Sequence, residues 1–130
     1  MRVVFDTNIF ISALILPGSS AEKAILKVIK GSDELIISHD IIDEALTVLS
    51  NKFSRNREAL SRTAVNLAEI GIIVKPRERI SVFQDEPDNR ILECATAGKA
   101  DAIVTGDKEM LRLGKYKEIK IISLKDYLVI

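Results

Sequence analysis

The hydrophobic positions of the chain fall into short runs of two kinds. Runs of β-branched and aromatic residues predict strands, whereas apolar residues spaced three and four positions apart predict helices. The predicted strands are 2–5, 34–38, 72–74, 102–105 and 119–122. The predicted helices are 9–15, 21–30, 39–53, 58–70, 88–97 and 108–113. Because strands alternate with helices, we expect an α/β fold, a three-layer α/β/α sandwich with a central, mostly parallel five-stranded sheet.

Polar residues that precede the predicted helices are expected to begin them. We expect Thr7 or Asn8 to cap the first helix, and Ser38 to cap the third. The segment that starts at Ser19 has the spacing of a capping box for the second helix. Asp88, directly after Pro87, is expected to open the fifth helix. A carboxylate there would be stabilised in its ionised form by the helix dipole.

Length and composition point to one globular domain, 1–130. The chain has 130 residues, of which 47% are hydrophobic, which is enough to bury a real core. The longest apolar stretches are too short to cross a bilayer, so no membrane association is expected. The first 16 residues lack the pattern of a signal peptide, because polar residues interrupt the apolar run. We therefore expect the protein to be cytoplasmic.

The scarcity of cysteine and histidine limits the metal chemistry that is available. Cys94 is the single cysteine and His39 the single histidine, so a multi-cysteine or multi-histidine zinc site is ruled out. A metal would have to be held mainly by carboxylates, which suit Mg²⁺ or Mn²⁺. The formal net charge is zero, so nucleic-acid binding would need a local basic patch.

Four acidic residues stand where an α/β sheet forms its ligand sites, outside the carboxyl ends of the strands. Asp6 follows the first predicted strand and Asp107 follows the fourth. Asp88 begins the helix before that fourth strand, and Glu44 lies in the helix after the second strand. Carboxylates that converge repel one another unless a divalent cation lies among them, and such a cation can activate water to attack a phosphodiester. Asp101 enters the fourth strand at its opposite end, so we interpret it as structural.

Each of these acids also has a purely structural explanation. Asp6, Asp88 and Asp107 could each cap a helix without any further role. Glu44 could be an ordinary solvated helix residue, and taken alone that is the better explanation. The functional hypothesis therefore depends on the set of four rather than on any one residue.

Three segments resemble the PIN-domain nucleases, a family that includes the VapC-like toxins of prokaryotic toxin–antitoxin pairs. The segments are VFDTN at 4–8, DEPDNRILECA at 85–95 and ADAIVTGD at 100–107, joined by an acid in the middle helix. The likeness covers nearly the whole chain and is greatest to the toxin-like branch whose last motif is Val-Thr-Gly-Asp followed by Lys. It implies an endoribonuclease that hydrolyses RNA phosphodiester bonds, often as a homodimer, and a cognate antitoxin protein as partner.

The resemblance also implies roles for individual residues. The acids that would bind Mg²⁺ or Mn²⁺ and activate water are Asp6, Glu44, Asp88 and Asp107. Thr105 is similar to the hydroxyl residue that supports the last acid, and Asn8 to a polar neighbour of the first. Asp85 and Glu93 are additional acids near these four. Glu93 lies about 140° around the helix from Asp88, where its support would be indirect. The candidate RNA contacts are Lys52, Arg55, Arg57, Lys108 and Arg112.

Other functions remain open on sequence grounds. A phosphatase of the haloacid-dehalogenase type would need a second aspartate two residues after Asp6, where this chain has Asn8. A receiver domain would need an acidic pair before its phosphorylated aspartate, and the acids do not fall in that pattern. A PIN-like module that only binds RNA or protein would be expected to lack one of the four acids, and all four are present. An RNA-processing nuclease without a toxin role fits the same residues.

Overall fold

The computed structural model describes residues 1–130, which form six strands and seven helices. The strands are β1 (Arg2–Phe5), β2 (Glu34–Ile37), β3 (Gly71–Ile73), β4 (Ala102–Thr105), β5 (Lys115–Tyr116) and β6 (Ile119–Ser123). The helices are α1 (Thr7–Ile15), α2 (Ser20–Ile29), α3 (His39–Phe53), α4 (Arg57–Ile70), α5 (Glu86–Ala97), α6 (Lys108–Leu113) and α7 (Leu124–Leu128). No single helix is long and apolar enough to span a membrane; α1 and α2 reach that length only as a pair bent by 104°.

The strands form one sheet in the order β3-β2-β1-β4-β6-β5. All neighbouring pairs are parallel except β5 and β6, which form an antiparallel hairpin at one edge. β1 and β4 lie side by side at the centre, with Phe5 opposite Val104. The residues that follow these two strands, Asp6 and the segment from Gly106, therefore leave the sheet at the same edge.

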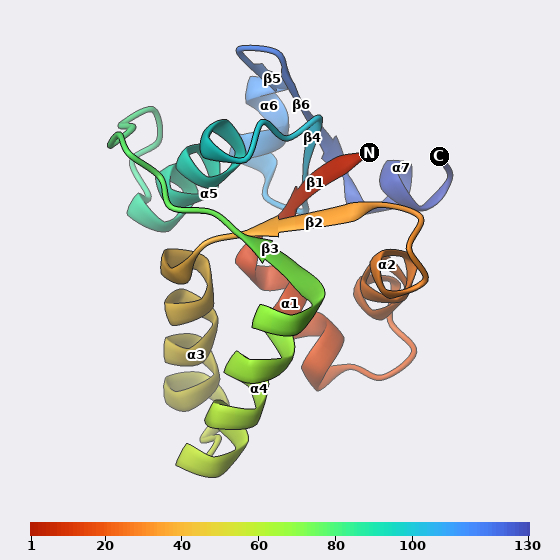
Figure 1. The fold of residues 1–130 in the computed structure, drawn as a ribbon, viewed down its shortest axis with the longest axis vertical. Coiled ribbons are helices and arrows are strands. Elements are labelled where there is room, and N and C mark those ends of the chain that lie inside the picture. The colour runs from red at the N-terminus through yellow and green to blue at the C-terminus, as the bar shows by residue number, and fades with distance from the viewer.

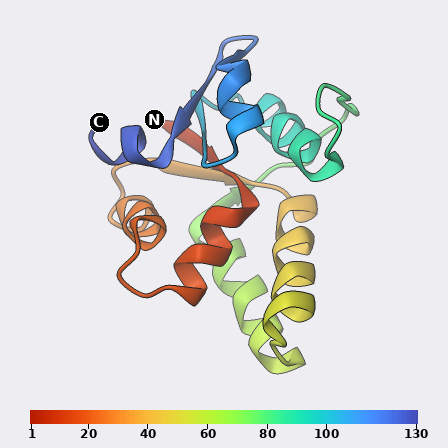
Figure 2. The ribbon, with the colours of Figure 1, turned by 180° about the vertical axis from the view of Figure 1, so that it is seen from behind.

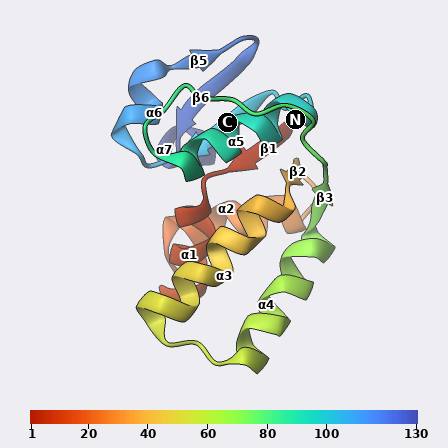
Figure 3. The ribbon, with the colours of Figure 1, turned by 90° about the vertical axis from the view of Figure 1, so that its left-hand side faces the viewer.

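Helices cover both faces of the sheet, which confirms the three-layer α/β/α fold. α5 packs on β1, β2 and β4 from one face, while α1 and α2 lie on the other (Figure 1). Seen from behind, α6 stands on the same side as α5 (Figure 2). α3 and α4 form an antiparallel pair that projects away from the sheet (Figure 3). The amino-terminal ends of α1, α3 and α5 thus border the carboxyl ends of the central strands.

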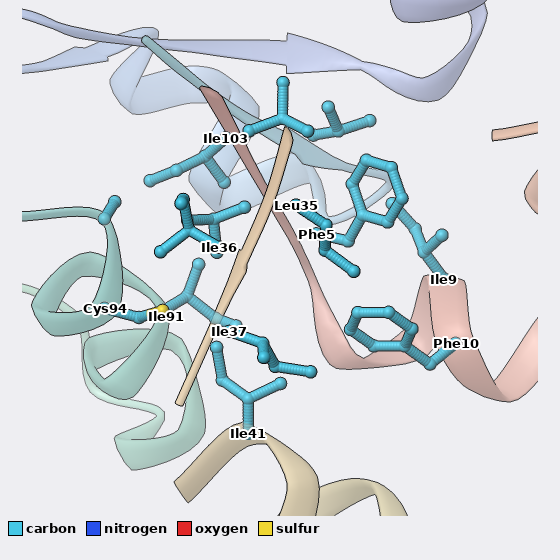
Figure 4. Close-up of a cluster of buried hydrophobic side chains, with 14 of the residues drawn as sticks. Phe5, Ile9, Phe10, Leu35, Ile36, Ile37, Ile41, Ile91, Cys94 and Ile103 are labelled. Carbon is cyan, nitrogen blue, oxygen red and sulfur yellow. The ribbon is translucent and has the colours of Figure 1, made fainter. Parts of the chain in front are cut away.

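One cluster of 30 buried hydrophobic residues joins the layers. Its centre is made by the fully covered faces of β1 and β2, whose side chains meet those of α1, α3 and α5 (Figure 4). Phe5 lies against Phe10 with ring centroids 5.9 Å apart and against Tyr127 at 5.5 Å. β1, β2 and β4 are buried on both faces, as expected for parallel strands that read as continuous apolar runs.

The observed helix starts correct several predicted boundaries. Asp6, rather than Thr7 or Asn8, is the N-cap of α1. Asp85 precedes α5, so Asp88 lies inside its first turn rather than opening it. Pro87 explains this shift, because proline is well tolerated in the first turn of a helix, where its missing N–H is not needed.

Two short elements were absent from the sequence prediction. β5 makes the sheet six-stranded instead of the predicted five-stranded. It has only two residues and pairs with β6 through a hairpin in which Lys117 has a φ of 53°. The helix α7 begins at Ser123, whose hydroxyl accepts the N–H of Asp126, and it buries Tyr127. Both elements are too short to show a hydrophobic period, so their formation depends on tertiary packing.

Candidate active site

Asp6 is held at the end of β1 by bonds from two directions. Its backbone N–H donates to the carbonyl of Val104, 2.9 Å away, which fixes it beside β4. Its Oδ1 accepts the N–H of Asn8 at 3.3 Å and so caps α1. Its Oδ2 accepts the hydroxyl of Thr105 at 2.7 Å. The side chain is 5% exposed, so its orientation is determined by these contacts.

Thr105 joins Asp6 to Asp107, the acid after β4. Its Oγ1 donates to Asp6 and accepts the backbone N–H of Asp107 at 3.0 Å. Asp107 caps α6, because its Oδ1 accepts the N–H groups of Glu109 at 2.7 Å and of Met110 at 3.2 Å. The hydroxyl predicted to support the last acid therefore contacts both acids.

Asp88 lies in the first turn of α5 and is 7% exposed. Its carboxylate has neither a hydrogen-bond donor nor a cation as partner within the chain. Burial is the largest cause that raises its pKa to about 7, and the next causes are the charges of Asp107 and Asp6. Burial also raises the pKa of Asp6, against the effect of its hydrogen bonds, and the charge of Asp107 adds to it. Asp6, Asp88 and Asp107, called the acid cluster below, are thus brought together.

Two further acids act on this cluster, and only one of them was noticed in the sequence. Asp85 and Glu109 both contribute to the raised pKa of Asp88. Asp85 was recognised as an extra acid, whereas Glu109 was missed. The signal that could have identified Glu109 is its position in the first turn of a helix capped by Asp107.

Glu44 lies beside the acid cluster rather than within it. It lines a cavity of about 260 Å³ between α3 and the start of α5, together with Thr7. Three other carboxylates border this acidic cavity, those of Asp40, Asp43 and Glu86. Glu44 is not among the charges that raise the pKa of Asp88. Its place next to Thr7 puts it within the neighbourhood of Asp6, but the structure shows no contact between the two acids.

Glu93 binds the irregular segment before α5 and two arginines. Its carboxylate is almost fully buried and accepts the N–H of Ile80 at 2.9 Å. It also pairs with Arg79 at 3.2 Å and with Arg90 at 3.1 Å. Glu93 therefore fastens the segment between β3 and α5 onto α5.

The predicted RNA contacts separate into two groups. Lys108 and Arg112 are exposed on α6, whose first residue directly follows Asp107. Lys52, Arg55 and Arg57 are exposed around the junction of α3 and α4. That junction is about 12 Å along α3 from Glu44, at 1.5 Å per residue. Only the first group adjoins the acid cluster.

The residues at the sheet edge fit a hydrated divalent cation. The structure contains no group of three or more His, Cys, Asp or Glu side chains arranged to hold a metal ion by themselves. Mg²⁺ commonly keeps several water ligands and binds through one or two carboxylates. Asp88, whose pKa is raised, lies near Asp6 and Asp107, and none of the three forms an ion pair with a lysine or arginine of the chain, so the cluster provides such carboxylates. A bound cation would lower the pKa of Asp88 and offset the repulsion in the cluster.

The fold and the acid cluster together define an α/β/α protein with a carboxylate site at the carboxyl edge of a parallel sheet. The model of the PIN domain family matches residues 2–109. The "Uncharacterized protein MJ1680" of Methanocaldococcus jannaschii is 31% identical over 132 residues, which cover 96% of this chain and 84% of that protein. The chain therefore belongs to the PIN-domain family. Nucleases of this family are hydrolases that act on nucleic acids, and they generally use divalent metal ions.

Two solved structures share the fold over nearly the whole chain. A chain in the crystal structure of VapBC2 from Rickettsia felis, bound to a DNA fragment from their promoter, superposes with a TM-score of 0.67 and 17% identity, covering 95% of this chain and 98% of that one. A chain of VapBC-1 from nontypeable Haemophilus influenzae gives a TM-score of 0.68 and 20% identity, covering 96% and 99%. At these identities the likeness establishes the common fold.

Proposed function

We propose that this protein is a metal-dependent endoribonuclease that hydrolyses RNA phosphodiester bonds at the acid cluster. The observation that carries the proposal is the convergence of Asp6, Asp88 and Asp107, none of which forms an ion pair within the chain. Such a cluster is costly for a folded protein unless it serves to hold a divalent ion. Bound Mg²⁺ or Mn²⁺ would supply a more acidic water as nucleophile and would stabilise charge on the phosphate.

The chain's own residues have distinct parts in this proposal. The hydroxyl of Thr105 joins Asp6 and Asp107, because it donates to the carboxylate of Asp6 and accepts the backbone N–H of Asp107. Asp88 completes the set of oxygen ligands from α5. Glu44, which lines the acidic cavity, would accept a proton or orient water on that side. Lys108 and Arg112 extend from α6 beside the site and would contact RNA phosphates.

Cleavage of labelled RNA tests this proposal. Purified protein is incubated with RNA in the presence of Mn²⁺, Mg²⁺ or a chelator, alongside Asp6→Asn and Asp101→Asn. Asparagine can still cap α1 at position 6, so the fold should be retained. Asp101 is a matched control, because its Oδ2 accepts the N–H of Arg2 at 2.7 Å, away from the cluster. We expect metal-dependent cleavage by the wild type and Asp101→Asn, and none by Asp6→Asn.

Two outcomes would contradict the proposal. If the metal-loaded wild type leaves RNA intact and Asp6→Asn behaves identically, the protein is not a nuclease under these conditions. If both bind RNA equally without cutting it, the protein is a PIN-like binding module.

We further propose that the protein is the toxin of a toxin–antitoxin pair. The support is the family, together with a fold shared with chains of two VapBC structures. Expression of the chain should arrest growth, and coexpression of a neighbouring antitoxin gene should relieve the arrest. Unaffected growth would favour an RNA-processing nuclease instead. In line with the family, we also expect a homodimer, which sedimentation equilibrium would detect.

An apolar groove offers a surface for such a protein partner. It lies between α1, α2 and α4, has a volume of about 450 Å³ and is lined by eight hydrophobic residues out of 11. Leu14, Leu26 and Ile29 are 41%, 42% and 58% exposed there. Leu26 also borders a second cavity that contains Lys23 and Lys30. Glu22 and Glu69 also line the groove, so the occupant that fits is an antitoxin segment with an apolar face and with acidic residues only on the side toward Lys23 and Lys30.

Introducing a negative charge into the groove tests this surface without touching the acid cluster. Leu26→Asp should prevent capture of the coexpressed antitoxin, while RNA cleavage is retained. Leu113→Asp is the matched control, since Leu113 has a similar exposure of 40% on α6. Equal antitoxin capture by Leu26→Asp and by the wild type would place the partner elsewhere.

A further inference from the structure

A small cavity without charged side chains lies beside the acid cluster. Its volume is about 280 Å³, and its walls include Asn8, Ser12, Leu16, Gly106 and Leu124. All nine residues that line it are neutral. The cavity adjoins the cluster on two sides, because the N–H of Asn8 donates to Asp6 and Gly106 directly precedes Asp107. It is called the neutral cavity below.

The neutral cavity and the acidic cavity differ sharply in charge. The acidic cavity is bordered by Asp40, Asp43, Glu44 and Glu86, against the single cation Arg90. Arg90 is already paired with Glu86 at 3.0 Å and with Glu93 at 3.1 Å, so little of its charge is left to attract an anion. A polyanionic strand that reaches the cluster therefore meets net repulsion in the acidic cavity and none from the walls of the neutral cavity.

Gly106 helps to keep the neutral cavity open. Its backbone has no left-handed φ that would require glycine. A Cβ atom built at this position would meet no other atom within 4 Å, so packing does not require glycine either. The open space beside Gly106 leaves room for a ligand close to the main chain, next to Asp107.

We infer that the neutral cavity holds the base of a nucleotide next to the scissile phosphate, an inference that rests on the proposed function. The walls from Leu16 and Leu124 suit the flat face of a base, and the exposed side-chain amide of Asn8 can both donate to and accept from a base edge. The volume is near the lower limit for ligand pockets, about 300 Å³, as suits one base. RNA sequences are commonly recognised through unstacked bases of this kind.

Filling the cavity from two of its walls tests the inference. Gly106→Val adds a side chain from the loop before Asp107, and Ser12→Leu adds one from α1. Thr47→Leu is the matched control, because exposed Thr47 borders the acidic cavity on the other flank. Thermal unfolding confirms that each variant is folded, and Ser12→Leu carries the test if Gly106→Val does not fold.

Cleavage of a random-sequence RNA pool reports the base on each side of every cut. We expect the wild type to prefer particular bases on one side. Both cavity variants should lose that preference and lower kcat/KM about tenfold or more, as added methylenes in a binding pocket commonly do. Thr47→Leu should cleave like the wild type. Wild-type preference and wild-type kcat/KM in both cavity variants would overturn the inference.

Binding of trinucleotides separates this inference from the proposed function. If the wild type cuts no RNA, the proposed nuclease activity fails while the cavity can still be examined by NMR titration. Shifts of the Asn8 and Gly106 amide signals that are lost in Ser12→Leu would support a base in the cavity. Absence of such shifts in the wild type would overturn it.

Discussion

Replacing Asp88 by asparagine should make the metal-free protein more stable at neutral and higher pH. The substitution removes one charge from the acid cluster while it keeps the size of the side chain. Burial and the neighbouring charges, led by Asp107, raise the pKa of Asp88 from 3.8 to about 7. The ionised form is therefore disfavoured in the folded protein relative to the unfolded chain.

The magnitude follows from the difference between the two pKa values. At 1.36 kcal/mol for each pH unit, the raised pKa of Asp88 destabilises the folded wild type by at most about 4 kcal/mol. Water at the edge of the cluster screens the charges, so we expect Asp88→Asn to raise the free energy of unfolding by about 1–2 kcal/mol.

The gain in the free energy of unfolding of Asp88→Asn should increase with pH. Between pH 3.8 and about 7, the folded protein keeps a proton that the unfolded chain has already released. The destabilisation caused by Asp88 therefore grows as the pH rises through this window and is constant above it. The variant and the wild type should have nearly the same stability at the acidic end of the window.

Urea unfolding followed by circular dichroism measures this difference across the window, with a chelator present. Adding Mg²⁺ should then stabilise the wild type more than Asp88→Asn, because only the folded wild type retains the full ligand set. Asp101→Asn serves as control, since its carboxylate lies away from the cluster. A stability difference that is independent of pH, or a variant less stable than the wild type near pH 8, would refute the argument that Asp88 is buried in an uncompensated acidic environment.

Three further substitutions test the supporting structure. Thr105→Val removes the hydrogen bonds that the hydroxyl makes to Asp6 and Asp107. We expect the free energy of unfolding in urea to fall by about 1–3 kcal/mol and RNA cleavage to slow. Thr105→Ser keeps the hydroxyl, so its stability and cleavage rate should be those of the wild type. Asp101→Ala removes the 2.7 Å bond from the N–H of Arg2; stability should fall by about 1 kcal/mol, with kcat for RNA cleavage unchanged. Gly98→Ala would place a Cβ against Ile36, which is fully buried; thermal unfolding should show a loss of about 1–3 kcal/mol.

The long elements of the fold could be predicted from the sequence because each carries its own hydrophobic period. β1, β2 and β4 are uninterrupted apolar runs, and α3 shows apolar residues at helical spacing over 15 residues. β5 and α7 are too short for a period, and they are fixed by contacts with distant parts of the chain. The phenol of Tyr127 in α7, for example, donates to Asp33 at 2.7 Å.

The candidate site was predictable to the extent that strand ends determine it. Asp6 and Asp107 follow adjacent parallel strands, so their proximity follows from the topology. The role of Glu93 was not predictable, because its partners Arg79 and Ile80 lie in an irregular segment. The neutral cavity could not be predicted from the sequence either, since its walls come from segments as far apart as Asn8 and Leu124.

Helix capping by these acids is compatible with the metal binding that we propose for them. Asp107 uses one oxygen, Oδ1, to accept two N–H groups of α6, which leaves Oδ2 free of intrachain bonds. Asp6 caps α1 with Oδ1 and accepts Thr105 with Oδ2, and a carboxylate oxygen has lone pairs for a second partner. The capping bonds fix the direction of each carboxylate before any cation binds. A sequence pattern that suggests a helix cap at a strand end is therefore compatible with a functional site.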